Sequence, residues 1–457
     1  MTMKEDVYGY LPEEKPETGK LILYALQQVI VMFPATITVA LITGFQVSTT
    51  IFASGLATLC FILITGGKIP LYYGSSFAYL SAIASMVMAE GSAEQIASWQ
   101  ATGILPTELI SKAQFGIIMS GFISIIAGLL VRKFGKDTVE KILPATITGP
   151  ISMIIGLTLA GNALSDAVLP AGEANATPYL IVALVTLIST IIFSVYLKGF
   201  LGQIPLLLGA ACGCICAGIL YATGTNLFRA ISDEALNSLG KFGPFAIPAF
   251  SLPKYSWNAL IGIMPIAIAT IPESTAHMYQ LDIYVNDVAK KKGKKMDYSL
   301  IDMLDKNLIG DGLCDMVSGV IGGPAGTNYG ENISTMAITK VFSVPVLVCA
   351  SIIAMIVACF TPLIKAIYGI PLAVIGGLEV YLFGAIAAQG IAIMIDKKVD
   401  MFSSKNIAVI ACICVIGIGG QYAFGGNIPI FGGIPCVAGA SIFGIALNAL
   451  LSIGDKK

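Results

Sequence analysis

The sequence contains few charged residues and only one histidine. Among its 457 residues 12% are Asp, Glu, Lys or Arg, whereas soluble proteins carry about 25%. The 26 basic residues nearly balance the 27 acidic ones, so a net charge of −1 gives no electrostatic basis for binding nucleic acid. One histidine and the lack of a metal-ligand motif offer little for hydrolysis. These deficits disfavour a nucleic-acid-binding protein and an enzyme, and we expect no metal and no cofactor.

The long polar loops lack cysteine. All ten cysteines lie in or beside apolar stretches, so the sequence predicts no disulfide framework. Cys212, Cys214 and Cys216 form a C-x-C-x-C run, but this spacing directs the side chains to different sides of a helix. We interpret them as packed thiols. The first twenty residues are polar and acidic, without the features of a signal peptide, so the first membrane span is expected to be retained.

Apolar residues dominate the chain: 56% are hydrophobic and the mean hydropathy is +0.85. A membrane-crossing helix needs about 20 mostly apolar residues, and this rule predicts an all-α polytopic membrane protein with about 14 transmembrane segments. They are expected to begin near Leu21, Thr49, Pro70, Ala113, Ile142, Tyr179, Gln203, Ala259, Leu308, Thr327, Phe342, Ile370, Ile407 and Ile434. A membrane tolerates the 49 glycines and 21 prolines only where neighbouring helices or a polar cavity satisfy the freed backbone groups, which is typical of transporters.

Basic residues indicate the orientation, because short cytoplasmic loops are enriched in Lys and Arg. The loops on one predicted side contain Lys68, Arg132, Lys133, Lys136, Lys141, Lys198, Lys290 to Lys295, Lys340, Lys397, Lys398, Lys405, Lys456 and Lys457. The short loops on the other side are acidic or neutral, and Asp166 and Glu173 are expected in one of them. We therefore predict a protein of the cell (cytoplasmic) membrane with both termini in the cytoplasm.

Three local similarities recur at a separation of roughly 230 residues. They pair Gly202–Ala210 with Gly432–Ala440, Pro144–Gly149 with Pro371–Gly376, and Tyr73–Ser76 with Tyr329–Asn332. Three matches in the same order indicate two repeats of about seven segments each. Since seven is odd, the second repeat enters the membrane from the opposite face, which predicts a 7+7 inverted repeat.

Two predicted segments are broken, and they occupy corresponding positions in the two repeats. Each begins after a proline, Pro70 or Pro324, contains a Tyr-Gly pair, and only then becomes apolar enough for a helix. We expect a short extended stretch followed by a half-helix, whose free N-terminal N–H groups can bind a carbonyl or an anion. Such interrupted segments mark the substrate site of inverted-repeat transporters.

Glu273 and His277 stand out because ionisable residues inside a membrane are costly. Their i, i+4 spacing places them on one helix face within contact distance. A carboxylate beside an imidazole can exchange a proton near neutral pH. The alternative is a structural pair that is bonded to a neighbouring helix.

Four other acidic residues are predicted inside the membrane. Glu331 follows Gly330 at the start of the second half-helix, where it could accept N–H bonds from a ligand or cap the helix. Asp311 and Asp315 are interpreted as structural residues of a short helix. Glu379 could face the other repeat or a polar cavity.

The stretch from Gly322 to Lys340 resembles the signature of the nucleobase–cation symporter family, which includes bacterial uracil permeases and nucleobase–ascorbate transporters. In that signature an acidic or amide residue precedes Asn, and Thr and a basic residue follow. The matching residues are Glu331, Asn332, Thr339 and Lys340. Further agreement comes from Gly310–Leu313, Gly74–Ala78 and the pair Glu273 and His277.

The resemblance implies a core domain and a gate domain that alternate in sequence. The core would comprise residues 1–131 and 258–360, and the gate residues 142–222 and 366–452. The residues matching the family's base-binding positions are Glu273, Glu331, Phe77 and Gly330. His277 would be linked to proton coupling together with Glu273 and Glu331, and Tyr329, Asn332 and Ser76 would support the site.

The resemblance implies import of uracil, or a closely related pyrimidine nucleobase, by proton symport as the core moves against the gate. H⁺ would be the coupling ion, and a homodimer is implied by the resemblance alone. The alternatives are a xanthine or other purine permease of this family, or an anion transporter of the same architecture. Three residues depart from the family pattern: Gln28 replaces the usual histidine, Ser334 replaces a glycine, and Glu379 occupies a position where a small or neutral residue is expected.

Overall fold

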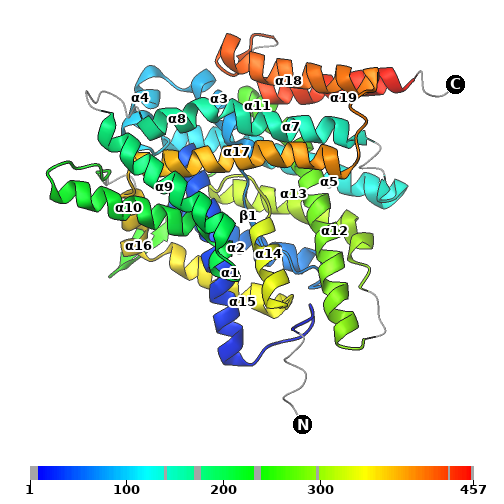
Figure 1. Cartoon of the computed structure of the whole chain (residues 1–457), viewed down its shortest axis with the longest axis horizontal. Helices are drawn as coiled ribbons and strands as arrows, with labels where there is room; N and C mark the ends of the chain where they lie inside the picture. The colour runs from blue at the N-terminus through cyan, green and yellow to red at the C-terminus, as the bar shows by residue number, and fades with distance from the viewer. Residues whose placement is uncertain are drawn as a thin grey trace.

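The computed structural model describes residues 9–137, 142–168, 176–230, 238–294, 298–430 and 433–453, which are mainly helical (Figure 1). Nine helical stretches within these ranges are long and apolar enough to cross a membrane. They are α1 (Thr18–Thr43), α2 (Val47–Ile64), α5 (Thr107–Phe134), α7 with α8 (Ala145–Thr158 and Ala160–Val168), α9 (Thr177–Tyr196), α10 (Pro205–Ala222), α11 with α12 (Trp257–Ile263 and Ala267–Lys291), α17 (Leu372–Asp396) and α18 (Ser404–Phe424).

The remaining helices are shorter or less apolar than these nine stretches. Three are apolar, namely a 3-10 turn with α3 (Phe77–Tyr79 and Leu80–Glu90), α15 (Val344–Ala358) and α19 (Cys436–Ser452). The others include α4 (Ala93–Thr102), α13 (Leu304–Ile321), α14 (Gly330–Thr339) and α16 (Thr361–Tyr368). The predicted helical membrane class is confirmed, whereas the number of fourteen segments stays a prediction.

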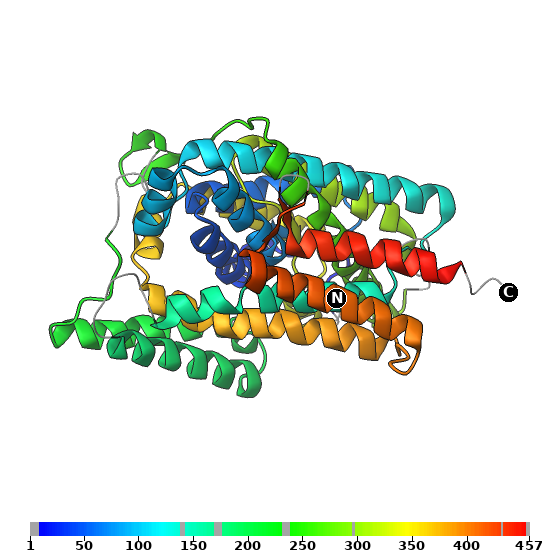
Figure 2. The same ribbon diagram turned by 90° about the horizontal axis from the view of Figure 1, so that it is seen from above.

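The described helices pack mainly within two groups (Figures 1 and 2). In one group α13 packs along α5 and α2, and α15 packs against α1 and α2. In the other group α17 packs against α7, α8 and α9, while α9 contacts α10 and α18 contacts α19 and α7. Elements of each group come from both halves of the sequence, so the chain crosses three times between them.

The two broken segments meet in a short antiparallel sheet, which confirms the predicted extended stretches. Strand β1 (Tyr73–Ser75) pairs with β4 (Gly326–Asn328), and Tyr73 lies opposite Asn328. Two further strand pairs lie outside these segments, β2 (Ser238–Phe242) with β3 (Phe245–Pro248) and β5 (Asn427–Ile428) with β6 (Ile434–Pro435). The strand β1 leads into the 3-10 turn and α3, and β4 leads into α14.

One of the three repeat similarities has the wrong register. Ser76 and Tyr329 are the residues that directly precede the two half-helices, so they correspond in structure. The sequence match instead paired Tyr73 with Tyr329, three residues out, because strand pairing rather than the Tyr-Gly motif sets the correspondence. The other two matches hold at their prolines: Pro144 and Pro371 precede α7 and α17, and Pro205 and Pro435 start or precede α10 and α19.

Some residues used for orientation lie outside the described ranges. These are residues 1–8 at the N-terminus and Lys141, Glu173, Lys295, Lys456 and Lys457. Gly432 of the repeat match is also outside them. Asp166 was expected in a loop, but it lies on α8, close to the end of that helix. The predicted orientation of the termini therefore stays a prediction.

An N-terminal strap, residues 9–14, crosses the ends of α12 and α14. The backbone N–H of Tyr10 donates to the carbonyl of Lys340, and the N–H of Phe342 donates to the carbonyl of Tyr10. Lys292 Nζ lies 2.6 Å from Glu14 Oε2, and Lys294 Nζ lies 2.6 Å from Glu13 Oε1. The strap thus ties the first described residues to the C-terminal ends of α12 and α14.

We expect this strap to weaken in acid. Partial burial alone would raise the pKa of Glu13, but the hydrogen bonds from Lys294 and Tyr298 leave that pKa below its ordinary value of 4.5. A lowered pKa means that the stabilisation is complete above about pH 4.5 and is lost as the pH falls through the folded-state value. Because Glu13 is exposed, the effect should stay below about 1 kcal/mol.

The measurement is thermal unfolding of the detergent-solubilised protein and of Glu13→Gln across this pH range. The difference between the two unfolding temperatures should shrink toward zero in acid. Glu17→Gln is the matched control, since the Glu17 side chain caps no backbone N–H at the start of α1. A difference for Glu13→Gln that persists at low pH would contradict the assignment.

Candidate functional site

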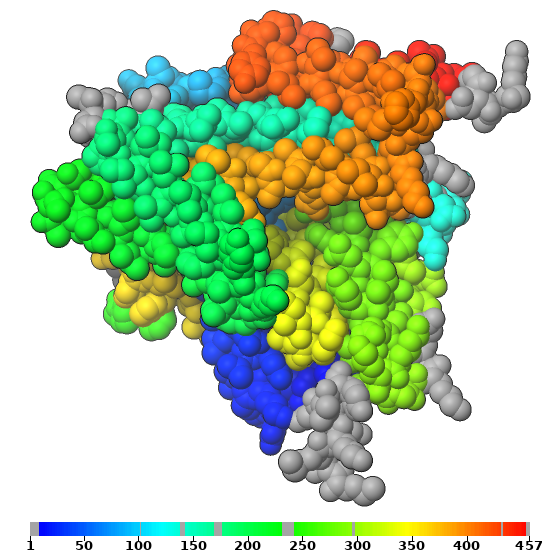
Figure 3. All heavy atoms as spheres, viewed as in Figure 1, coloured from blue at the N-terminus to red at the C-terminus, as the bar shows by residue number. Residues whose placement is uncertain are grey.

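A cavity of about 90 Å³ lies where the two broken segments meet the second helix group. One wall consists of β1, β4, the starts of both half-helices and the middle of α12, and the other wall consists of α7 and α17. The surface is hollowed between α17, α14 and α12 (Figure 3). The residues that line the cavity are Ser75, Ser76, Phe77, Ala78, Ser152, Ile155, Ala269, Pro272, Glu273, Thr327, Asn328, Tyr329, Gly330, Glu331, Ile386, Gln389 and Ile393.

Buried aspartates of α13 hold the strand crossing from behind. Asp315 Oδ1 accepts hydrogen bonds from the backbone N–H of Gly326, at 2.8 Å, and from the hydroxyl of Tyr73. It therefore bonds one residue on each strand. This contact supports the interpretation of Asp315 as a structural residue, because its oxygen is directed at the strands and not at the cavity.

Asp311 belongs to a second buried network behind the cavity. Its Oδ2 accepts from the hydroxyl of Ser274 and from Asn328 Nδ2, the latter at 3.3 Å. Asn307 Nδ2 donates to Ser274 Oγ at 2.6 Å, and Asn328 Nδ2 contacts Asn307 Oδ1 at 3.1 Å. These bonds fix Asn328, at the end of β4, against α12 and α13, which agrees with the structural interpretation of Asp311.

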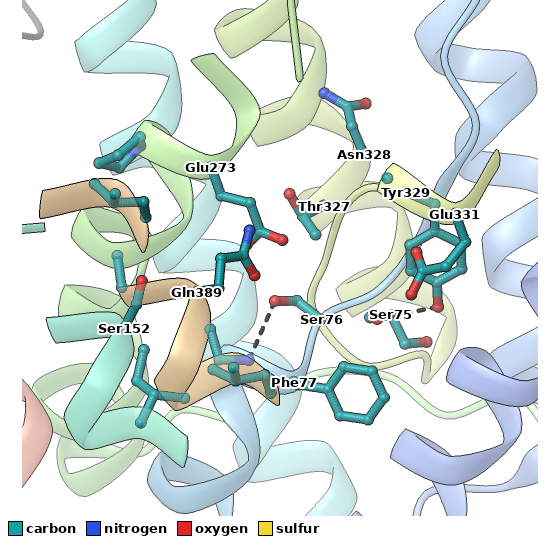
Figure 4. A pocket seen from close by; sticks show the side chains of 17 residues that line it. Ser75, Ser76, Phe77, Ser152, Glu273, Thr327, Asn328, Tyr329, Glu331 and Gln389 are labelled. Atoms are coloured by element: carbon teal, nitrogen blue, oxygen red, sulfur yellow. Dashed lines mark hydrogen bonds between the residues drawn. The ribbon is translucent and has the colours of Figure 1, made fainter. Parts of the chain in front are cut away.

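The hydroxyl of Tyr329 connects the half-helix start to the first half of the chain. It donates to the carbonyl of Ser75 at 3.0 Å and lies 2.9 Å from Thr36 Oγ1 on α1 (Figure 4). Asn332, one turn into α14, donates from Nδ2 to Gln28 Oε1 at 2.7 Å and to the Gln28 carbonyl at 3.0 Å. These bonds hold the start of α14 against β1 and α1, and the supporting role of Tyr329 and Asn332 stays a prediction.

Glu273 and Glu331 enter the cavity from different sides (Figure 4). Glu273 lies in the middle of α12, one residue after Pro272, and Glu331 lies in the first turn of α14. Among the described residues neither carboxylate has a side-chain hydrogen-bond donor or an ion-pair partner. The N-terminus of α14 favours a negative charge on Glu331, whereas Glu273 lies in the middle of its own helix.

Phe77, Gly330 and Ser76, which the family resemblance assigned to the site, also line the cavity. Phe77 begins the 3-10 turn that leads into α3, and the Ser76 hydroxyl accepts the N–H of Ala78 at 3.3 Å. Ser76 is thus partly used as a cap. The partly buried ring of Phe77 supplies the aromatic surface of the cavity.

His277 is placed differently from the predicted pair. It lies one turn after Glu273 on α12 but is not part of the cavity lining, and no hydrogen bond joins the two side chains among the described residues. Its ring instead lies beside the backbone of Asn328, and its buried Nδ1 has no hydrogen-bond partner among the described residues. A Cβ at Gly330 would lie 3.0 Å from His277 Nε2, so the ring packs directly against the start of α14. Helical spacing brings the residues to one face, but their side chains turn to different neighbours.

Several lining residues were not predicted from the sequence, and Ser152, Gln389 and Thr327 are polar examples. Ser152 on α7 and Gln389 on α17 bring polar groups from the second helix group, and Gln389 points toward the middle of the cavity (Figure 4). Thr327 on β4 is buried, and its hydroxyl has no hydrogen-bond partner in the described structure. The signal that could have identified Gln389 is a lone amide in the apolar run Ala385–Met394.

The cavity is rich in hydrogen-bond acceptors and poor in positive charge. In the part of the chain that the structure describes, no Lys, Arg or His side chain lines it. The described residues as a whole contain no group of three or more His, Cys, Asp or Glu side chains that could hold a metal ion. Two carboxylates therefore face a small space in which N–H donors of a ligand, or protons, would be their available partners.

Comparison of the sequence with known proteins identifies its relatives. The Permease family model Xan_ur_permease matches residues 19–426. The chain is 34% identical over 442 residues to the uracil permease of Bacillus caldolyticus, with 96% of this chain and 94% of that protein covered. It is 34% identical over 451 residues to the uracil permease of Bacillus subtilis, covering 95% and 93%, respectively.

Solved structures with the same fold are more distant in sequence. Murine Solute Carrier 26 family member A9, an anion transporter in the inward-facing state, matches with a TM-score of 0.67 at 13% identity, covering 100% of this chain and 73% of that one. The transmembrane domain of the cyanobacterial bicarbonate transporter BicA matches with a TM-score of 0.57 at 14% identity, covering 95% and 98%. At these identities the likeness concerns the fold, which is that of inverted-repeat transporters. The family match and the apolar helices together show that the chain is a multi-pass membrane protein of the Permease family, within the nucleobase–ascorbate transporter group.

Proposed function

We propose that this protein imports uracil, or a closely related pyrimidine nucleobase, through the cytoplasmic membrane together with a proton. The observation that carries the proposal is a cavity that presents two carboxylates, a half-helix N-terminus and an aromatic ring without a positive charge among its described lining residues. The names of the curated relatives, which are uracil permeases, support the same substrate class. Both termini would lie in the cytoplasm.

The chemistry of a pyrimidinedione complements this lining. The base has two N–H donors and two carbonyl acceptors. Glu273 and Glu331 accept from the N–H groups, the free backbone N–H groups at Gly330 donate to a carbonyl, and Phe77 packs on the ring. A donor or acceptor left unpaired in the closed site costs about 1–3 kcal/mol, so this complementarity selects the base.

Proton coupling follows from the charge of the site. A loaded site in which one carboxylate is protonated crosses the membrane interior more easily than one in which both are ionised. Glu273 would hold the proton because it lies in the middle of α12, whereas Glu331, in the first turn of α14, would remain the principal acceptor for the base. His277 would act through the positions of Asn328 and Gly330, since it touches both and does not reach the cavity.

The two helix groups would move against each other during transport. Residues 1–131 and 258–360 would form a core that contains Glu273 and Glu331, and residues 142–222 and 366–452 would form a gate that contributes Ser152 and Gln389. The cavity lies between the groups, so a relative movement would open it to one side and then to the other.

Uptake of radiolabelled uracil into proteoliposomes with an imposed pH gradient tests the function. We expect gradient-driven uptake that pyrimidines compete with and that Glu331→Gln reduces by about 10-fold or more, because an ionic acceptor of a base N–H contributes about 1.5–3 kcal/mol. Glu94→Gln, an exposed glutamate on α4, is the matched control with unchanged uptake. Uptake that is unaffected by Glu331→Gln would remove this residue from the binding site.

The same uptake assay distinguishes two other classes of substrate. Competition by xanthine or adenine without competition by thymine would identify a purine permease of this family. Uptake of sulfate without any uracil uptake would identify an anion transporter, which is disfavoured because no described basic side chain lines the cavity.

A further inference from the structure

Helices α8 and α17 are in backbone contact away from the substrate cavity. A Cβ at Gly376 would lie 2.2 Å from the backbone nitrogen of Ala167, so only a glycine fits between the two helices there. Glu379 follows Gly376 by three residues and therefore lies on the same face of α17. Asp166 precedes Ala167 on α8. The close approach of the helices thus brings two acidic residues together.

Glu379 is completely buried, with 0% of its surface exposed, and neither of its carboxylate oxygens has a hydrogen-bond donor among the described residues. The carboxyl group of Asp166 lies within hydrogen-bonding reach of it. Two ionised carboxylates are acceptors only, so they cannot bond each other. A hydrogen bond between them requires a proton on one of the two.

The charges around the pair agree with one shared proton. Arg229, in the segment after α10, interacts electrostatically with Asp166 and with Tyr368, which ends α16. Arg229 also donates from Nη2 to the Thr102 carbonyl at 3.3 Å, while its buried Nη1 has no hydrogen-bond partner in the described structure. With one proton the group of Arg229, Asp166 and Glu379 is neutral, and without it the group has one excess negative charge.

The other elements near the pair bring no second formal charge. Tyr179 of α9 and Cys214 and Cys216 of α10 pack in the adjoining apolar cluster with Ala167. The helix α7 has no titratable residue. Arg229 is therefore the cation that faces the pair, and Tyr368 is the remaining titratable side chain beside that cation.

We propose that Asp166 and Glu379 form a proton-binding site between α8 and α17, separate from the substrate cavity, in which one proton is shared by the two carboxyl groups. Gln389 lies ten residues further along α17, or about 15 Å at 1.5 Å per residue, so the two sites are linked by one continuous helix. Loss of the proton leaves two carboxylates in contact and pushes α8 away from α17. This proton-binding site is not part of the proposed substrate site, and its existence does not depend on which substrate is transported.

Infrared spectroscopy of the full chain without substrate tests the proposal. Exchange from mildly acidic to alkaline buffer should remove a C=O stretching band of a protonated carboxylic acid, with release of one proton per chain more than from Glu379→Gln. Glu379→Gln should lack this band and this proton, because the amide donates to Asp166 permanently. Asp166→Asn should lack them as well, because the asparagine amide then donates to an ionised Glu379.

Thermal unfolding provides the second readout. A proton bound only in the folded state stabilises at low pH, and that stabilisation is lost as the pH rises. The unfolding temperature of the wild type should therefore fall in alkaline buffer more than that of Glu379→Gln. Glu331→Gln is the control, since it changes a carboxylate of the cavity and should keep the band of the pair.

Two results would overturn the proposal. Equal proton release by the wild type and both variants would show that the pair binds no proton. A band that is lost in Glu379→Gln but kept in Asp166→Asn would show a solitary protonated Glu379 and no sharing. Neither result depends on uptake, so failure of the uracil assay is distinguishable from failure of this site.

Discussion

Replacement of Glu273 by glutamine is expected to reduce proton-driven uracil uptake by about 10- to 150-fold. The estimate corresponds to the upper part of the range of about 1–3 kcal/mol that is lost when a buried N–H group of the base is left without a good acceptor. The loss of the protonatable group adds to this, since a glutamine cannot release a proton to the far side. The measurement is the initial rate of uptake into proteoliposomes with and without an imposed pH gradient.

Exchange of uracil across the membrane without a gradient separates the two roles of Glu273. If the residue binds both base and proton, Glu273→Gln loses exchange and uptake together. If it carries only the proton, exchange persists while accumulation stops. Full gradient-driven accumulation by Glu273→Gln would contradict both roles and would leave Glu331 as the remaining carboxylate of the described cavity lining.

The second large effect is expected from Gly326→Ala at the strand crossing. A Cβ at this position would lie 2.3 Å from the carbonyl oxygen of Gly74 and 2.5 Å from the ring of Tyr73. The first contact is with backbone, so β1 and β4 must separate. The N–H of Gly326 would then move from Asp315 Oδ1, to which it donates at 2.8 Å.

We expect Gly326→Ala to destabilise the fold by about 1–3 kcal/mol, as overpacking does in other interiors, and to abolish uptake. Uptake is lost because β4 carries Thr327 and leads directly into Gly330 and Glu331. The measurements are the thermal unfolding temperature in detergent and the uptake rate of the reconstituted protein. A variant with the unfolding temperature and uptake rate of the wild type would show that β1 and β4 can separate without loss of stability or function.

Gly218→Ala is the matched control for this substitution. No heavy atom lies within 4 Å of a Cβ at Gly218, which is inside α10. Alanine is a better helix former than glycine by about 1 kcal/mol, so the control should be as stable as the wild type or slightly more stable. The contrast between the two variants isolates the close approach from the general effect of adding a methyl group.

Local sequence patterns were sufficient to predict the broken segments and to single out Glu273 and Glu331, whereas the family resemblance assigned Phe77, Gly330 and Ser76 to the site. A proline followed by a short polar stretch and an apolar run predicts an extended segment before a half-helix, because these preferences act within a few residues. Glu273, Glu331, Phe77, Gly330, Ser76 and Tyr329 all line the cavity, because they lie on or beside those segments. Asn332 lies behind it, against Gln28.

The sequence by itself determined the helical membrane class, the two broken segments and the acidic residues of α12 and α14. The cost of burying a charge in a membrane and the helix-breaking effect of proline and glycine are both local properties of the sequence. Only the tertiary structure decided the register between the two halves and the orientation of the His277 side chain toward Asn328. It also decided that Ser152 and Gln389 line the cavity. It alone placed Asp166 beside Glu379. These features depend on contacts between residues far apart in the chain, and helical spacing gives the face of a side chain but not the neighbour that it meets.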